Sequence, residues 1–175
     1  GGGLYIDQSH ATLEFNSIGS NTAHSGGGLY SSGRAITLTA NTVVSNTALM
    51  GGGVYLYYNN STLNANTISF NRATLDNGEG GGIFIYYSNP VLNRNIITFN
   101  YADWGGGLSL FRSSPALINT VVADNTAGEY GSGLSIRLNS SPHIWHSTIA
   151  RNLGGDGAGV LITGMGCSVG MTNTV

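Results

Sequence analysis

Apolar residues recur along this chain at fixed positions of a repeat about 25 residues long. Position 4 of each repeat is always aliphatic, and it is occupied by Leu4, Leu29, Val54, Ile83, Leu108, Leu134 and Val160. Position 6 is apolar in every repeat but the second, so position 5 between them is expected to face outward, as in a half-buried strand. Two more short apolar runs centre on position 18 and on position 13, which holds Leu13, Leu38, Leu63, Leu92, Leu117, Ile144 and Val169. Such runs are too short for helices and predict three short strands per repeat, joined by polar corners.

A glycine-rich corner opens each repeat. The triplet at residues 1–3 returns at residues 26–28, 51–53, 80–82 and 105–107, and two degraded copies begin at Gly131 and Gly157. The spacings are 25, 25, 29, 25, 26 and 26 residues. A fixed period in this range is typical of solenoids, in which each repeat forms one rung. We therefore expect six full rungs and a partial seventh, stacked into three parallel sheets around an aliphatic core.

Asparagine forms two further columns. Position 21 is occupied without a break by Asn21, Asn46, Asn71, Asn100, Asn125 and Asn152. Position 16 is asparagine in the first four repeats. Asparagine tolerates the left-handed backbone of a corner, and identical side chains one rung apart can bond to each other as a ladder. Both columns therefore predict structural corners.

The glycine triplets and asparagine columns together resemble the right-handed parallel β-helix proteins. The resemblance is greatest to glycine-rich and Asn-turn repeats of bacterial surface and secreted proteins, including the polymorphic outer-membrane protein type. It implies the all-β fold of the pectate-lyase-like superfamily, a right-handed parallel β-helix, as a single domain over residues 1–175. Neither end carries a polar cap, so we expect a segment of a longer solenoid or a unit that self-associates through its open ends.

Composition narrows the partners and the location. Charged residues make up 8% of the chain, the net charge is −2, and all six basic residues are arginine. Nucleic acid is therefore a poor partner, because its affinity comes mainly from basic side chains. No apolar run is long enough to predict a membrane span. The abundance of Asn, Ser, Thr and Gly favours an extracellular or cell-surface location.

Acidic residues mark the corner that leads into the glycine triplet. Asp76 and Glu79 lie in the insertion of the third repeat, and Asp103, Glu129 and Asp156 lie at the same corner of the next three. Adjacent rungs of a β-helix are about 4.8 Å apart, so these carboxylates could gather. Asp76, Glu79, Asp103 and Glu129 are accordingly a candidate Ca²⁺ site, because that ion binds several oxygens. The alternative is a solvated corner, and no other cofactor is predicted.

Aromatic residues occupy the outward positions 5, 7 and 8 of several repeats. A stacked, exposed aromatic face is typical of a binding surface, and tyrosines can stack on sugar rings or on a partner protein. Stacking between rungs explains the same pattern without a ligand. The candidate ligand-binding residues are Tyr30, Tyr55, Tyr57, Tyr86, Tyr87 and Phe111.

Two classes of function fit these features. The first is an extracellular or cell-surface rod, structural or adhesive, that binds a polysaccharide or a cell-surface glycan and can assemble end to end into a fibre. The second is a carbohydrate-active enzyme, a polysaccharide lyase or hydrolase, with Asp103, Glu129 and Asp156 as candidate catalytic residues. A fragment of a phage or secreted depolymerase is a variant of this alternative. We favour the rod, because no spacing fixes two carboxylates at a catalytic separation.

Overall fold

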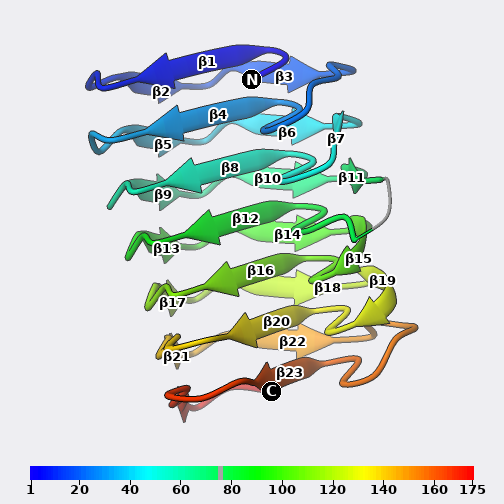
Figure 1. The fold of residues 1–175 in the computed structure, drawn as a ribbon. Helices are drawn as coiled ribbons and strands as arrows, with labels where there is room; N and C mark the ends of the chain where they lie inside the picture. The colour runs from blue at the N-terminus through cyan, green and yellow to red at the C-terminus, as the bar shows by residue number, and fades with distance from the viewer. Residues whose placement is uncertain (75–76) are drawn as a thin grey trace.

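The computed structural model describes residues 1–74 and 77–175, and it is a parallel β-helix of about seven rungs (Figure 1). The two termini lie at opposite ends of the stack (Figure 1). The described residues form strands and corners but no helix. They therefore include no helix that could cross a membrane. The predicted all-β parallel solenoid is confirmed.

The first sheet runs through all seven rungs. Its strands pair in parallel and in register, so that Leu29 lies opposite Val54 and Val54 lies opposite Ile83. The column of aliphatic residues at position 4 is therefore a column in space. The strands, in their order in the sheet, are β1 (Leu4–Asp7), β4 (Leu29–Ser32), β8 (Val54–Tyr57), β12 (Ile83–Tyr86), β16 (Leu108–Phe111), β20 (Leu134–Arg137) and β23 (Val160–Thr163).

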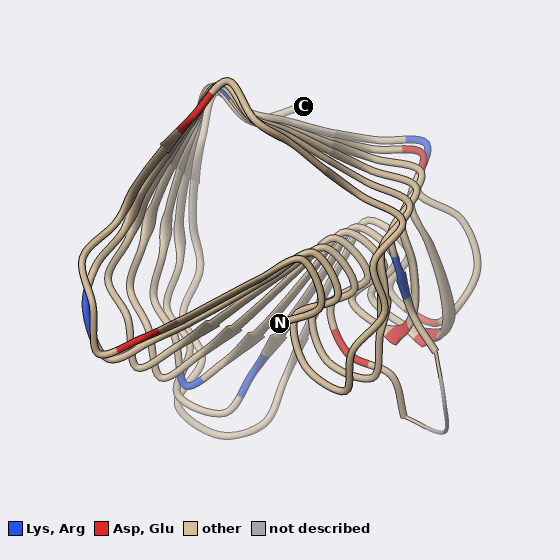
Figure 2. Cartoon of the chain, turned by 90° about the horizontal axis from the view of Figure 1, so that it is seen from above, with Lys and Arg blue, Asp and Glu red and all other residues tan. Residues whose placement is uncertain are grey.

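Two more sheets complete the triangular cross-section seen in Figure 2. The second sheet contains β2 (Thr12–Glu14), β5 (Thr37–Thr39), β9 (Thr62–Asn64), β13 (Val91–Asn93), β17 (Ala116–Ile118), β21 (His143–Trp145) and β24 (Gly170–Thr172). The third sheet contains β3 (Ser17–Gly19), β6 (Thr42–Val44), β10 (Thr67–Ser69), β14 (Ile96–Thr98), β18 (Val121–Ala123) and β22 (Thr148–Ala150). One predicted column is wrong at its end, because Met171 rather than Val169 lies opposite Ile144.

A fourth, smaller sheet adds to the three that the sequence predicts. It forms in the segment that runs from the asparagine column at position 21 to the next glycine corner, which we call the arm. Figure 2 shows the arms leaving the triangle as loops beside one of its sides. The sheet consists of β7 (Thr47–Ala48), β11 (Arg72–Ala73), β15 (Tyr101–Trp104) and β19 (Thr126–Tyr130).

The core is a stack of aliphatic layers, one per rung. In the fourth rung the side chains of Ile83, Ile85, Leu92 and Ile97 are all fully buried. Each such side chain contributes about 1.5–3 kcal/mol by leaving water. Because one rung exposes its upper and lower surfaces, this burial depends on the neighbouring rungs.

The corners place a left-handed residue immediately before each asparagine, not at the asparagine as the sequence suggested. Phe70 has φ 56°, and Phe99 has φ 57°, and each precedes an asparagine of the position-21 column. The asparagine is needed instead for its side chain, which lies inside the stack. Asn71 and Asn100 are buried and bond to the rungs on both sides.

The predicted asparagine ladder is present along the whole position-21 column. The backbone N–H and Nδ2 of Asn71 donate to Oδ1 of Asn100 at 2.9 and 3.1 Å, and Nδ2 also donates to the carbonyl of Val43 at 2.9 Å. The same bonds repeat from Asn21 to Asn152. Within this column every bond between neighbouring asparagines runs from donor to acceptor toward the C-terminal end, so the ladder has a direction.

Candidate functional site

The aromatic residues at position 5 are exposed or partly exposed only in the first two rungs, at Tyr5 and Tyr30, and are buried in the next two, which corrects the predicted exposed face. Tyr55 is 6% exposed and Phe84 is 2% exposed. These side chains do point out of the aliphatic core, but the arm lies along the same face of the first sheet. The carboxylate of Glu79, an arm residue, accepts a hydrogen bond from Ser109 of this column at 3.1 Å. Tyr55 is therefore a packing residue and not a ligand-binding one.

Positions 7 and 8 carry the exposed aromatic surface. Tyr57 stacks on Tyr86 with centroids 5.5 Å apart, and Tyr58 stacks on Tyr87 at 4.8 Å, with interplanar angles of 18° and 9°. Tyr86 stacks in turn on Phe111 at 5.1 Å. We call these five residues the aromatic ridge. Parallel rings at these separations are offset stacks that hold one another rigidly and cover part of each other's faces.

The two ends of the aromatic ridge differ. At the C-terminal end the guanidinium of Arg112 lies 5.3 Å from the ring centroid of Tyr87, and that of Arg137 lies 5.6 Å from the centroid of Phe111. At the N-terminal end, position 8 of the preceding rung is Gly33, whose N–H donates to the carbonyl of Tyr57 at 3.1 Å. No ring from that rung covers Tyr58, which is 50% exposed. The ridge thus ends in arginines on one side and in an open tyrosine on the other.

Tyr58 was not among the predicted binding residues. The sequence feature that indicates its exposure is Gly33, at position 8 of the preceding rung. Because glycine has no side chain, Tyr58, the first aromatic residue in the position-8 column, has no neighbouring ring on that side. Tyr5 is comparable, because it is 64% exposed and stacks on Tyr30 at 4.9 Å. Its column, however, continues into the buried Tyr55. Tyr58 instead belongs to the aromatic ridge, whose four other residues are all partly exposed.

Tyr30 stacks on the exposed Tyr5 but is itself only partly exposed. It contacts Tyr55 edge to face, with ring centroids 5.4 Å apart. It belongs to the position-5 column and lies outside the aromatic ridge. Of the predicted ligand-binding residues, the ridge contains Tyr57, Tyr86, Tyr87 and Phe111.

An ion pair ties the arm to the first sheet. Arg137 of β20 donates to the carboxylate of Glu79, which lies 58 residues earlier in the chain. The same guanidinium lies 4.5 Å from the ring centroid of Trp104, another arm residue. Glu79 therefore has a basic partner within the protein, which lowers its value as a metal ligand. Both side chains of the pair are partly buried, and the pair joins the arm to β20.

The described part of the chain contains no cluster of side chains that could serve as the predicted calcium site. Asp103 accepts a hydrogen bond from the N–H of Gly78 at 3.0 Å, whereas Glu129 and Asp156 are exposed. Asp76 lies outside the described residues. Among the described residues, no group of three or more His, Cys, Asp or Glu side chains could hold a metal ion. The calcium and catalytic roles thus stay predictions without geometric support.

Two tyrosines, the buried Tyr55 and the partly exposed Tyr86, make the protein sensitive to alkali. Burial raises the pKa of Tyr55 well above its usual value near 10, and the neighbouring Tyr30 and Tyr57 act in the same direction. Burial also raises the pKa of Tyr86. Because the folded chain holds these protons more tightly than the unfolded chain, their stabilisation is complete below pH 10 and is lost as the pH rises past 10.

Replacing Tyr55 by phenylalanine tests this effect. We expect Tyr55→Phe to unfold at a higher pH than the wild type, because no phenol remains there to ionise in the unfolded chain. Stability at neutral pH should change little, since the Tyr55 hydroxyl donates to no described residue. Circular dichroism followed from pH 8 to strong alkali measures both. An unchanged alkaline midpoint would contradict the assignment.

Parallel strands stacked over about seven rungs define this chain as a β-solenoid protein. The sequence model of the right handed beta helix region matches residues 1–153. The chain therefore belongs to the right-handed β-helix family. No curated protein and no solved structure matches it. The likeness to the polymorphic outer-membrane type accordingly stays a prediction.

Proposed function

We propose that this chain is a rigid extracellular or cell-surface rod that binds a glycan at the aromatic ridge. The observation that carries the proposal is Tyr58, a half-exposed ring at the open end of a stack. A sugar ring binds well to an aromatic face that is exposed and already immobile, because little conformational entropy is lost on binding. Tyr87 beneath Tyr58 supplies that rigidity.

The other tyrosines of the aromatic ridge offer hydrogen-bonding groups along the axis of the rod. The hydroxyls of Tyr57 and Tyr86 can each donate and accept, as sugar hydroxyls do, whereas the Tyr87 hydroxyl already accepts from Arg112 and keeps its proton to donate. Successive rungs set these groups about 4.8 Å apart, which is close to the length of one pyranose unit in an extended chain. A glycan whose terminal ring stacks on Tyr58 would therefore follow the rod axis. The low charge of the chain agrees with a neutral ligand held by stacking and hydroxyl contacts.

Replacing Tyr58 by alanine is expected to weaken glycan binding about tenfold or more, because the stacking partner is removed. A glycan array identifies the ligand, and isothermal titration calorimetry then measures its dissociation constant for wild type and variant. The thermal midpoint of unfolding should stay close to that of the wild type, since half of the Tyr58 side chain is already exposed.

Phe70 provides a matched control. It is 55% exposed and stacks on Phe99 of the next rung at 5.0 Å and 10°, but it lies at a different corner of the triangle. Phe70→Ala should leave glycan affinity unchanged. Equal losses in the two variants, or no binding to any glycan on the array, would contradict the proposal.

A further inference from the structure

The second rung lacks large side chains at two outer positions that the next rungs fill. At position 8 it has Gly33, where the next two rungs have Tyr58 and Tyr87. At position 10 it has Ala35, where the next two rungs have asparagine. Both positions belong to the corner that follows the first sheet, and both are exposed in the second and third rungs. The open face of Tyr58 therefore lies at the same corner as the small residues of the second rung.

The position-10 residues form a second ladder, on the outside of the rod. The backbone N–H of Asn89 donates to Oδ1 of Asn60 at 2.6 Å, and the N–H of Ser114 donates to Oδ1 of Asn89 at 2.7 Å. These N–H groups are thus directed toward the side chain of the preceding rung. By the same register the N–H of Asn60 faces Ala35, whose methyl group cannot accept. It makes no hydrogen bond with any described residue.

Asn60 therefore presents mainly donors. The bond from Asn89 fixes the orientation of its amide, since a backbone N–H must meet the oxygen and not the nitrogen. Its Nδ2 and its backbone N–H remain to donate, and neither has an acceptor in the described part of the chain. Tyr58 lies two residues earlier, so the two Cα atoms are within about 7 Å. A ligand on Tyr58 thus meets an aromatic ring and N–H donors together.

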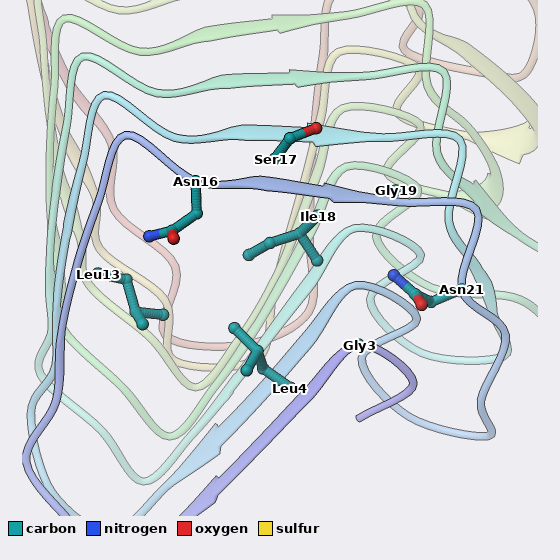
Figure 3. Close-up of a pocket in the computed structure, with 8 residues that line it drawn as sticks. All are labelled: Gly3, Leu4, Leu13, Asn16, Ser17, Ile18, Gly19 and Asn21. Atoms are coloured by element: carbon teal, nitrogen blue, oxygen red, sulfur yellow. The ribbon is translucent and has the colours of Figure 1, made fainter.

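These groups belong to the outer surface of the rod, because its interior is aliphatic. In the first rung the side chains of Leu4, Leu13 and Ile18 point toward one another inside the triangle (Figure 3). On the outside, the side chain of Gln8 lies against Gly33, since a Cβ on that glycine would be 2.5 Å from the Gln8 amide. Gln8 is itself exposed, so its side chain can move when a ligand approaches.

We propose that the aromatic ridge selects a glycan whose terminal sugar carries an N-acetyl group. The inference rests on the proposed glycan binding and names the class of sugar. The sugar ring stacks on Tyr58, and the acetyl carbonyl accepts from the N–H groups of Asn60. The acetyl methyl group lies over the methyl group of Ala35. A hydroxyl at the same sugar carbon could also accept, but it would leave that methyl group in water.

A neutral acceptor fits this corner better than a carboxylate does. Arg34 lies between Gly33 and Ala35, but its guanidinium is directed toward Nε2 of His10 at 3.4 Å, in the rung before. A carboxylate on the ligand would have to draw this side chain away from His10. The acetyl carbonyl needs only the donors that Asn60 already presents.

Calorimetric titration with three matched trisaccharides tests the class of sugar. All have β-1,4 linkages, and they consist of N-acetylglucosamine, glucose or glucuronic acid. We expect the N-acetylglucosamine trimer to bind about tenfold more tightly than the glucose trimer, because a hydrogen bond and a methyl contact are added. Equal affinities, or tightest binding of the glucuronic acid trimer, would overturn the inference and leave glycan binding at Tyr58 in place. Binding to no glycan at all would contradict the proposed function as well.

The substitution Ala35→Asn tests whether Asn60 is the donor. The new amide can accept from the N–H of Asn60, as Oδ1 of Asn60 accepts from Asn89. We expect this variant to bind the N-acetylglucosamine and glucose trimers about equally. Ala65→Asn is the control, because Ala65 is an exposed alanine at a different corner, and it should keep the preference. A preference that survives in Ala35→Asn would overturn the role of Asn60, and matching circular dichroism spectra confirm that both variants fold.

Discussion

Replacing Asn71 by alanine is expected to destabilise the protein by about 3–5 kcal/mol, which is near the upper limit for a single substitution. Asn71 is fully buried. Its Oδ1 accepts from the N–H and Nδ2 of Asn46 at 2.9 and 3.0 Å, and its Nδ2 donates to Asn100 and Val43. The variant loses four hydrogen bonds and leaves their buried partners unsatisfied, which costs more than the bonds themselves. Urea denaturation followed by circular dichroism measures the change.

Asn21 is the matched control, because it has the same position in the first rung. It donates to Asn46 at 3.0 Å, but it is only partly buried, and its Oδ1 accepts from no described residue. Asn21→Ala should cost about 1 kcal/mol or less, since water can replace the missing partner. Equal costs at Asn71 and Asn21 would show that the ladder contributes through local corner conformation and not through bonds between rungs.

The second large effect is expected at Gly82, the third glycine of its corner. An alanine Cβ there would lie 2.6 Å from the carbonyl oxygen of Gly107 and 3.0 Å from Nδ2 of Asn100. Neither atom can move without disturbing the next rung, because the first is backbone and the second belongs to the ladder. We expect Gly82→Ala to lower the free energy of unfolding by about 3 kcal/mol. Denaturant titration measures it.

The last rung supplies the control for this glycine. Position 3 is glycine in every rung, at Gly3, Gly28, Gly53, Gly82, Gly107, Gly133 and Gly159. At Gly159, a Cβ would meet only one atom of the described residues, Cγ2 of Ile149 at 4.0 Å. Gly159→Ala should change stability by no more than about 0.5 kcal/mol. A large loss in this variant would mean that the glycine is needed for its own backbone conformation.

The sequence predicts the repeating part of the fold because equivalent positions are packed in the same way in every rung. The columns of Leu56, Ile85 and Leu110 are visible in the sequence, since a residue that fills the core of one rung must match those above and below. The asparagine ladder is visible for the same reason. Its exact bonding is not, because the left-handed residue proves to be Phe70 or Phe99 rather than the asparagine that follows.

The parts that differ between rungs could not be read from the sequence. The arm pairs only two residues between β7 and β11, which is too short to produce an alternating pattern. A prediction that does not include the arm therefore treats Tyr55 as exposed, because position 5 faces away from the aliphatic core. The contact between Glu79 and Arg137 joins positions 58 residues apart that share no column. The sequence shows that Tyr58 is aromatic, but the exposure of its ring depends on Gly33 in the preceding rung.

The central claim is that the open end of the aromatic ridge binds a glycan. Two-dimensional NMR spectra of the tyrosine ring carbons, recorded while the best glycan from the array is added, test it most directly. We expect the largest shifts at Tyr58 and smaller ones at Tyr57 and Tyr87, with Tyr5 unchanged although it is 64% exposed. Largest shifts at Tyr5, or no tyrosine shifts at saturating glycan, would contradict the account.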